Sequence, residues 1–99
     1  MTNKIQIPTN YQKDIDKAIK ILKSAACTDI FLFGSLAAGK PSDGSDIDLA
    51  VRGCPPGKYF HLLGQLLLEL EHPVDLVRLD TPDAFARHLE QEGALVRIG

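Results

Sequence analysis

Three short strand patterns alternate along this sequence with helical patterns, and the alternation limits the fold to a small sheet covered by helices. Residues 29–33 and 74–79 are apolar runs rich in strand formers. Residues 46–52 alternate between two faces, one with Asp46, Asp48, Ala50 and Arg52 and the other with Ile47, Leu49 and Val51. The order predicts an α/β (α+β) fold, with a small mixed β-sheet of three to four strands flanked by helices.

The first helical stretch spans residues 11–27 and is amphipathic. Its apolar positions recur at steps of four and three, and its charged positions predict a solvent-facing side. The apolar set is Ile15, Ile19, Leu22 and Ala26, and the charged set is Lys13, Asp14, Lys17, Lys20 and Lys23.

Two later stretches also carry helical signals. The leucine-rich stripe of residues 59–70 predicts a well-buried helix, with a partner contact surface over part of it as the alternative. Thr81 and Pro82 predict the N-cap and first residue of a last helix that ends at Gly93. Residues 94–98 are expected to form one last short strand.

Size and charge narrow the class of protein. With 99 residues, 44% hydrophobic and 24% charged, residues 1–99 are expected to form a single domain. So short a chain removes only roughly 60–70% of its unfolded surface from water, so a homo- or hetero-oligomer is a reasonable expectation. A net charge of −2 without a basic run argues against direct nucleic-acid binding.

Targeting and metal patterns point to a cytoplasmic protein with no zinc site. Residues 1–8 lack a signal-peptide core, and no apolar stretch approaches the ~20 residues needed to cross a membrane. Cys27 and Cys54 are far apart and form no CxxC pattern, which favours reduced structural thiols. The three histidines show no zinc-ligand spacing.

A Gly-Ser turn follows the first strand pattern. Gly34 lacks a Cβ, so an anion can approach the backbone, and the free N–H groups of a new helix would point toward it. Ser35 adds a hydroxyl donor. Taken alone, a Gly-Ser after a strand is usually an ordinary tight turn.

Asp46 and Asp48 lie two residues apart in the second strand pattern, so their side chains share one face. They can converge on one cation, whereas without it the two charges repel by about 2.5 kcal/mol at an effective dielectric near 20. The alternative is an edge strand whose aspartates face solvent. Asp75 is a third carboxylate, inside an otherwise apolar run, where it needs a metal, a catalytic role or an ion pair with Arg52 or Arg78.

The joint pattern of Gly34-Ser35, ten residues, Asp46-Ile47-Asp48 and the separate Val74-Asp75-Leu76-Val77 resembles the DNA polymerase β-like nucleotidyltransferase superfamily. It is most similar to the minimal nucleotidyltransferase (MNT) branch, the antitoxin partners of HEPN-domain toxins. The resemblance implies a metal-dependent enzyme that transfers AMP from ATP to a tyrosine hydroxyl of the toxin.

The same resemblance implies roles for particular residues. Gly34 and Ser35 would hold the β- and γ-phosphates, with Lys40 and Ser45 of the following loop as further nucleotide contacts. Asp46, Asp48 and Asp75 would bind Mg²⁺ or Mn²⁺, and Asp75 would also activate the attacking hydroxyl.

One departure from this branch leaves two other functions open. Members commonly carry arginines just after the Gly-Ser, whereas this chain has Leu36-Ala37-Ala38. The first alternative is a weak or inactive antitoxin that neutralises the toxin by binding. The second is a transferase acting on RNA ends or small molecules, which the lack of a second domain and the negative charge disfavour.

Overall fold

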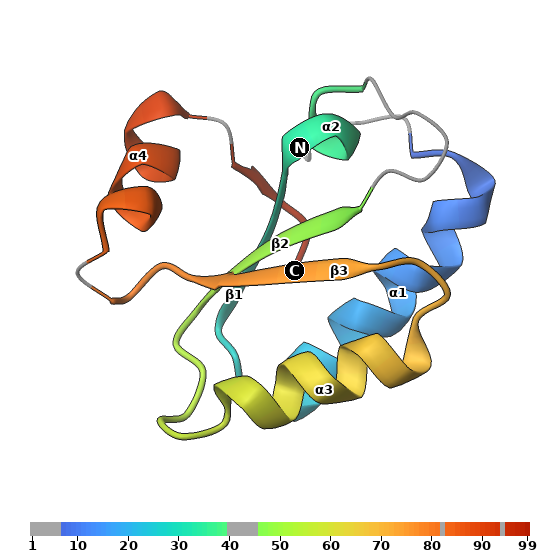
Figure 1. Ribbon diagram of the computed structural model, residues 1–99, viewed down its shortest axis with the longest axis horizontal. Helices are drawn as coiled ribbons and strands as arrows, with labels where there is room; N and C mark the ends of the chain where they lie inside the picture. Colours follow the sequence, from blue (N-terminus) through green and yellow to red (C-terminus); the bar gives the residue numbers. More distant parts are fainter. Residues whose placement is uncertain (1–6, 40–45, 82, 94) are drawn as a thin grey trace.

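A four-stranded sheet with helices against it forms the described part of the chain (Figure 1). The computed structural model describes residues 7–39, 46–81, 83–93 and 95–99, so the predicted contacts Lys40 and Ser45 lie outside it. The elements are α1 (Thr9–Ser24), β1 (Asp29–Phe33), α2 (Gly34–Ala37), β2 (Ile47–Arg52), α3 (Tyr59–Glu69), β3 (Val74–Arg78), α4 (Ala84–Glu92) and β4 (Val96–Arg97).

The sheet is mixed, as predicted, with strand order β3-β2-β1-β4. β1 pairs with β2 and β4 in antiparallel fashion, and β2 pairs with β3 in parallel. A parallel pair needs a crossover connection, which α3 provides. β3 therefore lies at one edge of the sheet.

The side-chain alternation of the strands divides the core between the two sheet faces. Ile47, Leu49 and Val51 pack with α1 and α3 on one face. Ala50 and Phe33 face the other side and pack with Ala86 and Leu89 of α4. Figure 1 shows α1 and α3 together on one side of the sheet and α4 on the other. Because Asp48 alternates with Ile47 and Leu49, it belongs to the α4 face.

Asp14 was predicted to lie on the solvent side of α1. This prediction is wrong, because Asp14 is only 3% exposed. Its carboxylate accepts hydrogen bonds from the backbone N–H groups of Glu71 and His72, and Nδ1 of His72 lies 2.8 Å from Oδ2. The connection from α3 to β3 folds over this side of α1. The backbone N–H groups of this connection need an acceptor, and Asp14 provides it. The periodicity of α1 alone could not reveal this contact.

α3 is buried along a narrower stripe than the sequence predicted. Leu62 and Leu66 are buried, whereas Leu67 and Leu68 are exposed. The prediction of a well-buried helix is right for one side only. Across the described ranges, no helix is both long and apolar enough to cross a membrane.

α4 begins at a different cap from the predicted one. Asp83 is the N-cap, and its side chain accepts a hydrogen bond from the Phe85 N–H at 3.2 Å. The Thr81 hydroxyl, predicted to cap this helix, instead donates to the Arg78 carbonyl. Gly93 ends the helix, as predicted, and its backbone is in the left-handed conformation.

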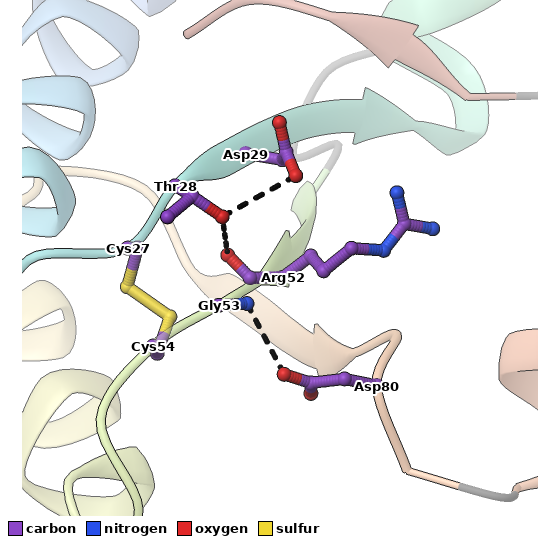
Figure 2. The surroundings of a disulfide bond; sticks show 7 residues. All are labelled: Cys27, Thr28, Asp29, Arg52, Gly53, Cys54 and Asp80. Atoms are coloured by element: carbon purple, nitrogen blue, oxygen red, sulfur yellow. Dashed lines mark hydrogen bonds between the residues drawn. A yellow bond between two sulfur atoms is a disulfide. The ribbon is translucent and has the colours of Figure 1, made fainter.

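A disulfide joins Cys27 to Cys54, so the prediction of reduced thiols is wrong (Figure 2). The antiparallel register pairs Asp29 with Arg52. Each cysteine lies two residues beyond that pair, so the register brings them opposite each other. The bridge closes the end of the β1–β2 pair remote from Gly34.

Candidate active site

Asp48 and Asp75 are register partners across the parallel strands β2 and β3. Neighbouring strands lie about 4.8 Å apart and register partners share a face, so the two carboxylates project from the same face side by side. Asp46 comes just before β2 and is exposed. The three predicted aspartates thus lie at one end of two adjacent strands.

The negative charges of this cluster affect the pKa of Asp48. Burial raises the pKa of its carboxyl group, and the charges of Asp75 and Asp46 raise it further, to about 6. Each of these causes disfavours the ionised form. A bound proton or a cation would relieve the repulsion.

Asp75 is exposed. The expectation that a carboxylate in this strand lies inside the core is therefore wrong. β3 is an edge strand, and Asp75 is on the sheet face opposite its buried neighbours Val74 and Leu76. The alternative of an ion pair finds no support in the described residues, because Arg52 pairs with Glu90 of α4 and the Arg78 guanidinium lies 5.3 Å from the centre of the Tyr59 ring.

Gly34 ends the extended segment of β1 and lies against Asp48. A Cβ built on Gly34 would collide with Oδ2 of Asp48 and stand 3.0 Å from its Cγ. The backbone also has φ +76° there, a conformation that favours glycine. The absence of a side chain at Gly34 is what leaves room for the carboxylate.

Ser35 and Leu36 continue into the one-turn helix α2. Ser35 is half-buried, and the first N–H groups of any helix lack acceptors within it. Leu36 is fully buried in the core. The first position after the Gly-Ser pair is therefore occupied by a core residue, which supplies no cation to the turn.

The donor set fits a hard divalent cation. Adjacent carboxylates that repel one another are suited to Mg²⁺ or Mn²⁺, both of which prefer oxygen ligands. As the described side chains lie, no three acidic, histidine or cysteine groups are arranged to hold an ion. The carboxylates would therefore need to turn toward a shared ion.

A cavity of about 730 Å³ along the free edge of β3 was not predicted from the sequence. Asp75 lines it, together with Tyr59 and Phe60 of α3 and Phe85 of α4. Burial raises the pKa of Tyr59, as does the nearby Asp75 charge, which outweighs the opposite effect of Arg78. The walls come from three separate segments, so no local sequence pattern could reveal the cavity.

Comparison with known proteins relates this geometry to one family. The family model described as polymerase beta, nucleotidyltransferase matches residues 13–97. A comparison with curated protein sequences gave no match.

Solved structures of toxin-antitoxins are similar to this chain. One, with AMP-PNP, has a TM-score of 0.67 and 28% identity, over 83% of this chain and 69% of that chain. A mutant of MntA-HpeT has a TM-score of 0.67 and 27% identity, over 86% and 71%. MntA-HepT itself has a TM-score of 0.62 and 25% identity, over 87% and 69%.

Proposed function

The chain belongs to the polymerase β nucleotidyltransferase family, and from that membership we propose that it transfers AMP from ATP to a tyrosine hydroxyl of a partner HEPN-domain toxin, as the antitoxin of the pair. The observation that carries the proposal is the pairing of Asp48 with Asp75 beside Gly34. The similar toxin-antitoxin structures, one of them with an ATP analogue, support the choice of nucleotide and partner.

Each site residue has a role in this proposal. Gly34 and Ser35 bind the β- and γ-phosphates through backbone N–H groups and the serine hydroxyl. Lys40 and Ser45 add nucleotide contacts. Asp46, Asp48 and Asp75 hold Mg²⁺ or Mn²⁺, which when bound neutralises the triphosphate charge.

The reaction is an in-line displacement at the α-phosphorus. The acceptor hydroxyl oxygen forms a bond to that phosphorus, and the bond from phosphorus to the α,β-bridging oxygen breaks. Pyrophosphate leaves with the bonding electron pair, and the hydroxyl proton passes to the Asp75 carboxylate. Asp75 is exposed and therefore accessible to an acceptor carried by another protein. Positioning of the two reactants supplies much of the rate.

A second candidate is an antitoxin that neutralises its toxin by binding alone. The buried Leu36 favours it, since this position supplies no cation to the triphosphate. Under this alternative, Asp48→Asn would still copurify with the toxin and suppress toxicity. Under the enzymatic proposal the variant still binds but no longer modifies it.

The experiment is to incubate the purified chain with its coexpressed HEPN-domain partner, labelled ATP and Mg²⁺, and to locate the label by mass spectrometry. We expect AMP on a partner tyrosine with the wild type and with Asp16→Asn, and none with Asp48→Asn. Asp16 is a matched control, because it is an exposed carboxylate of α1 bonded to Gln12. An unlabelled partner with wild type and Asp48→Asn alike would overturn the proposal.

A further inference from the structure

We propose that the cavity along the free edge of β3 is the acceptor subsite, and that Phe60 and Phe85 are the walls that receive the aromatic hydroxyl side chain. The inference rests on the proposed function and extends it to residues that determine which acceptor is used. Phe60, at the start of α3, and Phe85, at the start of α4, line this cavity with Asp75.

The strand order fixes the direction from which an acceptor must come. Gly34 at the end of β1, Asp48 in β2 and Asp75 in β3 follow one another across the sheet. With the terminal phosphates at Gly34, pyrophosphate leaves on the β1 side. In-line attack requires the hydroxyl to approach from the opposite side, which is the free edge of β3 and its cavity.

The two phenylalanines are exposed without a covering element in the described chain. The exposed fraction of the residue is 82% for Phe60 and 47% for Phe85. Each has an edge-on aromatic neighbour, Tyr59 at 5.2 Å and Phe33 at 6.2 Å between ring centres, which steadies its orientation. Two solvent-facing rings that line one cavity offer apolar contact to a third aromatic ring.

The free edge of β3 is partly occupied by hydrogen bonds from within the chain. The outward-facing carbonyls of Leu76 and Arg78 already accept hydrogen bonds from the hydroxyls of Tyr59 and Thr81. A partner segment would therefore lack these carbonyl acceptors for continuous strand pairing. The cavity is suited to an inserted side chain rather than to an added strand.

The charge of the cavity lining favours an acceptor over a nucleotide as the occupant. Besides Asp75, which belongs to the metal site of the proposed function, the carboxylate of Asp83 lines the cavity and repels a triphosphate. Arg78 also lines it, but its guanidinium lies over the Tyr59 ring. The complementary occupant is a neutral or basic protein segment that carries an aromatic hydroxyl.

The test compares Phe60→Ala with Leu68→Ala in transfer from ATP to the HEPN-domain partner. Leu68 is a matched control, since it is an exposed apolar residue of α3, 88% exposed, and does not line the cavity. We expect Phe60→Ala to raise KM for the partner about tenfold or more while KM for ATP stays within twofold. Leu68→Ala should leave both constants within twofold.

Two outcomes would overturn the inference. An equal effect of the two variants on KM for the partner would indicate a general apolar contact of α3. A rise in KM for ATP with Phe60→Ala, without a change in KM for the partner, would assign the cavity to the nucleoside.

A second measurement does not depend on turnover, so it separates failure of this inference from failure of the proposed function. A photocrosslinker, p-benzoylphenylalanine, is placed at position 60 or 68 and the crosslinked partner peptides are mapped. Position 60, unlike position 68, should crosslink to a tyrosine-bearing segment, even if wild type proves inactive. Absence of that crosslink from a stable complex would contradict the acceptor subsite.

Discussion

Gly34 and the carboxylate of Asp48 are in direct contact where β1 ends beside β2. A Cβ on Gly34 would stand 3.0 Å from Cγ of Asp48, and the glycine has φ +76°. Two separate constraints, room for a carboxylate and a left-handed backbone, therefore apply at the same residue. The phosphate-binding turn and the carboxylate cluster are built against each other.

Gly34→Ala should lower both stability and transfer. Strain at positive φ costs about 1 kcal/mol or more, and displacement of Asp48 should reduce AMP transfer at least tenfold. Gly93→Ala is the control, because Gly93 has φ +66° but nothing within 4 Å of a built Cβ. Urea denaturation should show at least as much destabilisation for Gly34→Ala as for Gly93→Ala, and transfer assays should show a loss of activity for Gly34→Ala alone. Equal activity in the two variants would refute a role for the contact.

Asp48→Asn should stabilise the chain at pH 7 in metal-free buffer while abolishing transfer. The pKa of Asp48 is raised from 3.8 to about 6, so the carboxyl is neutral in both folded and unfolded states below about pH 4. The contribution of the neutral Asp48 carboxyl group to folding stability is lost as the pH rises through about 6. We expect the variant to melt several degrees above wild type at pH 7, with little difference at pH 4.

Thermal melts between pH 4 and pH 8 check this, with Asp16→Asn as the control carboxylate. Melting temperatures of wild type and Asp48→Asn that differ equally at both pH values would show that repulsion within the cluster is not the cause.

Asp14→Ala should destabilise the chain by about 3 kcal/mol, because backbone N–H groups of Glu71 and His72 lose their acceptor. Burial raises the pKa of Asp14, but hydrogen bonds from these residues and the His72 side chain lower it overall. The stabilisation is therefore present above about pH 4 and is lost as pH falls through the lowered pKa. Urea denaturation at pH 7 measures it, and exposed Asp16→Ala should change stability by well under 1 kcal/mol.

Reduction of the Cys27–Cys54 disulfide should also lower stability. A sequence separation of 27 corresponds to about 3.5 kcal/mol of loop-closure free energy. Cys54→Ser should unfold at lower urea with or without dithiothreitol, whereas wild type should shift only when reduced. Transfer well below the melting temperature should be unchanged, because the bridge lies at the end of β1–β2 remote from Asp48. A reduced wild type with unchanged stability would contradict this account.

Strand positions were predictable because period-two alternation and glycine stops are local signals. Residues 29–33 form β1 as predicted, and the 46–52 pattern yields β2 from Ile47. The alternation also placed Asp46 and Asp48 on one face. The prediction that Asp48 and Asp75 lie close together depended on the family resemblance. Local patterns could not supply it, because strand order is a property of the whole chain.

Other features depended on contacts between distant segments. Asp14 is bound by a connection more than fifty residues away, and Cys27 meets Cys54 only through the register of β1 with β2. The exposure of Asp75 depends on the edge position of β3 together with the sheet face that Asp75 occupies. Local patterns carry no information about any of these.

The most direct test of the central claim, a cation held by the clustered carboxylates, is a Mn²⁺ titration followed by electron paramagnetic resonance in the presence of AMP-PNP. Wild type and Asp16→Asn should bind Mn²⁺ with the same affinity, and Asp48→Asn or Asp75→Asn should bind at least tenfold more weakly. Equal affinity in all four proteins would contradict a metal site formed by Asp46, Asp48 and Asp75.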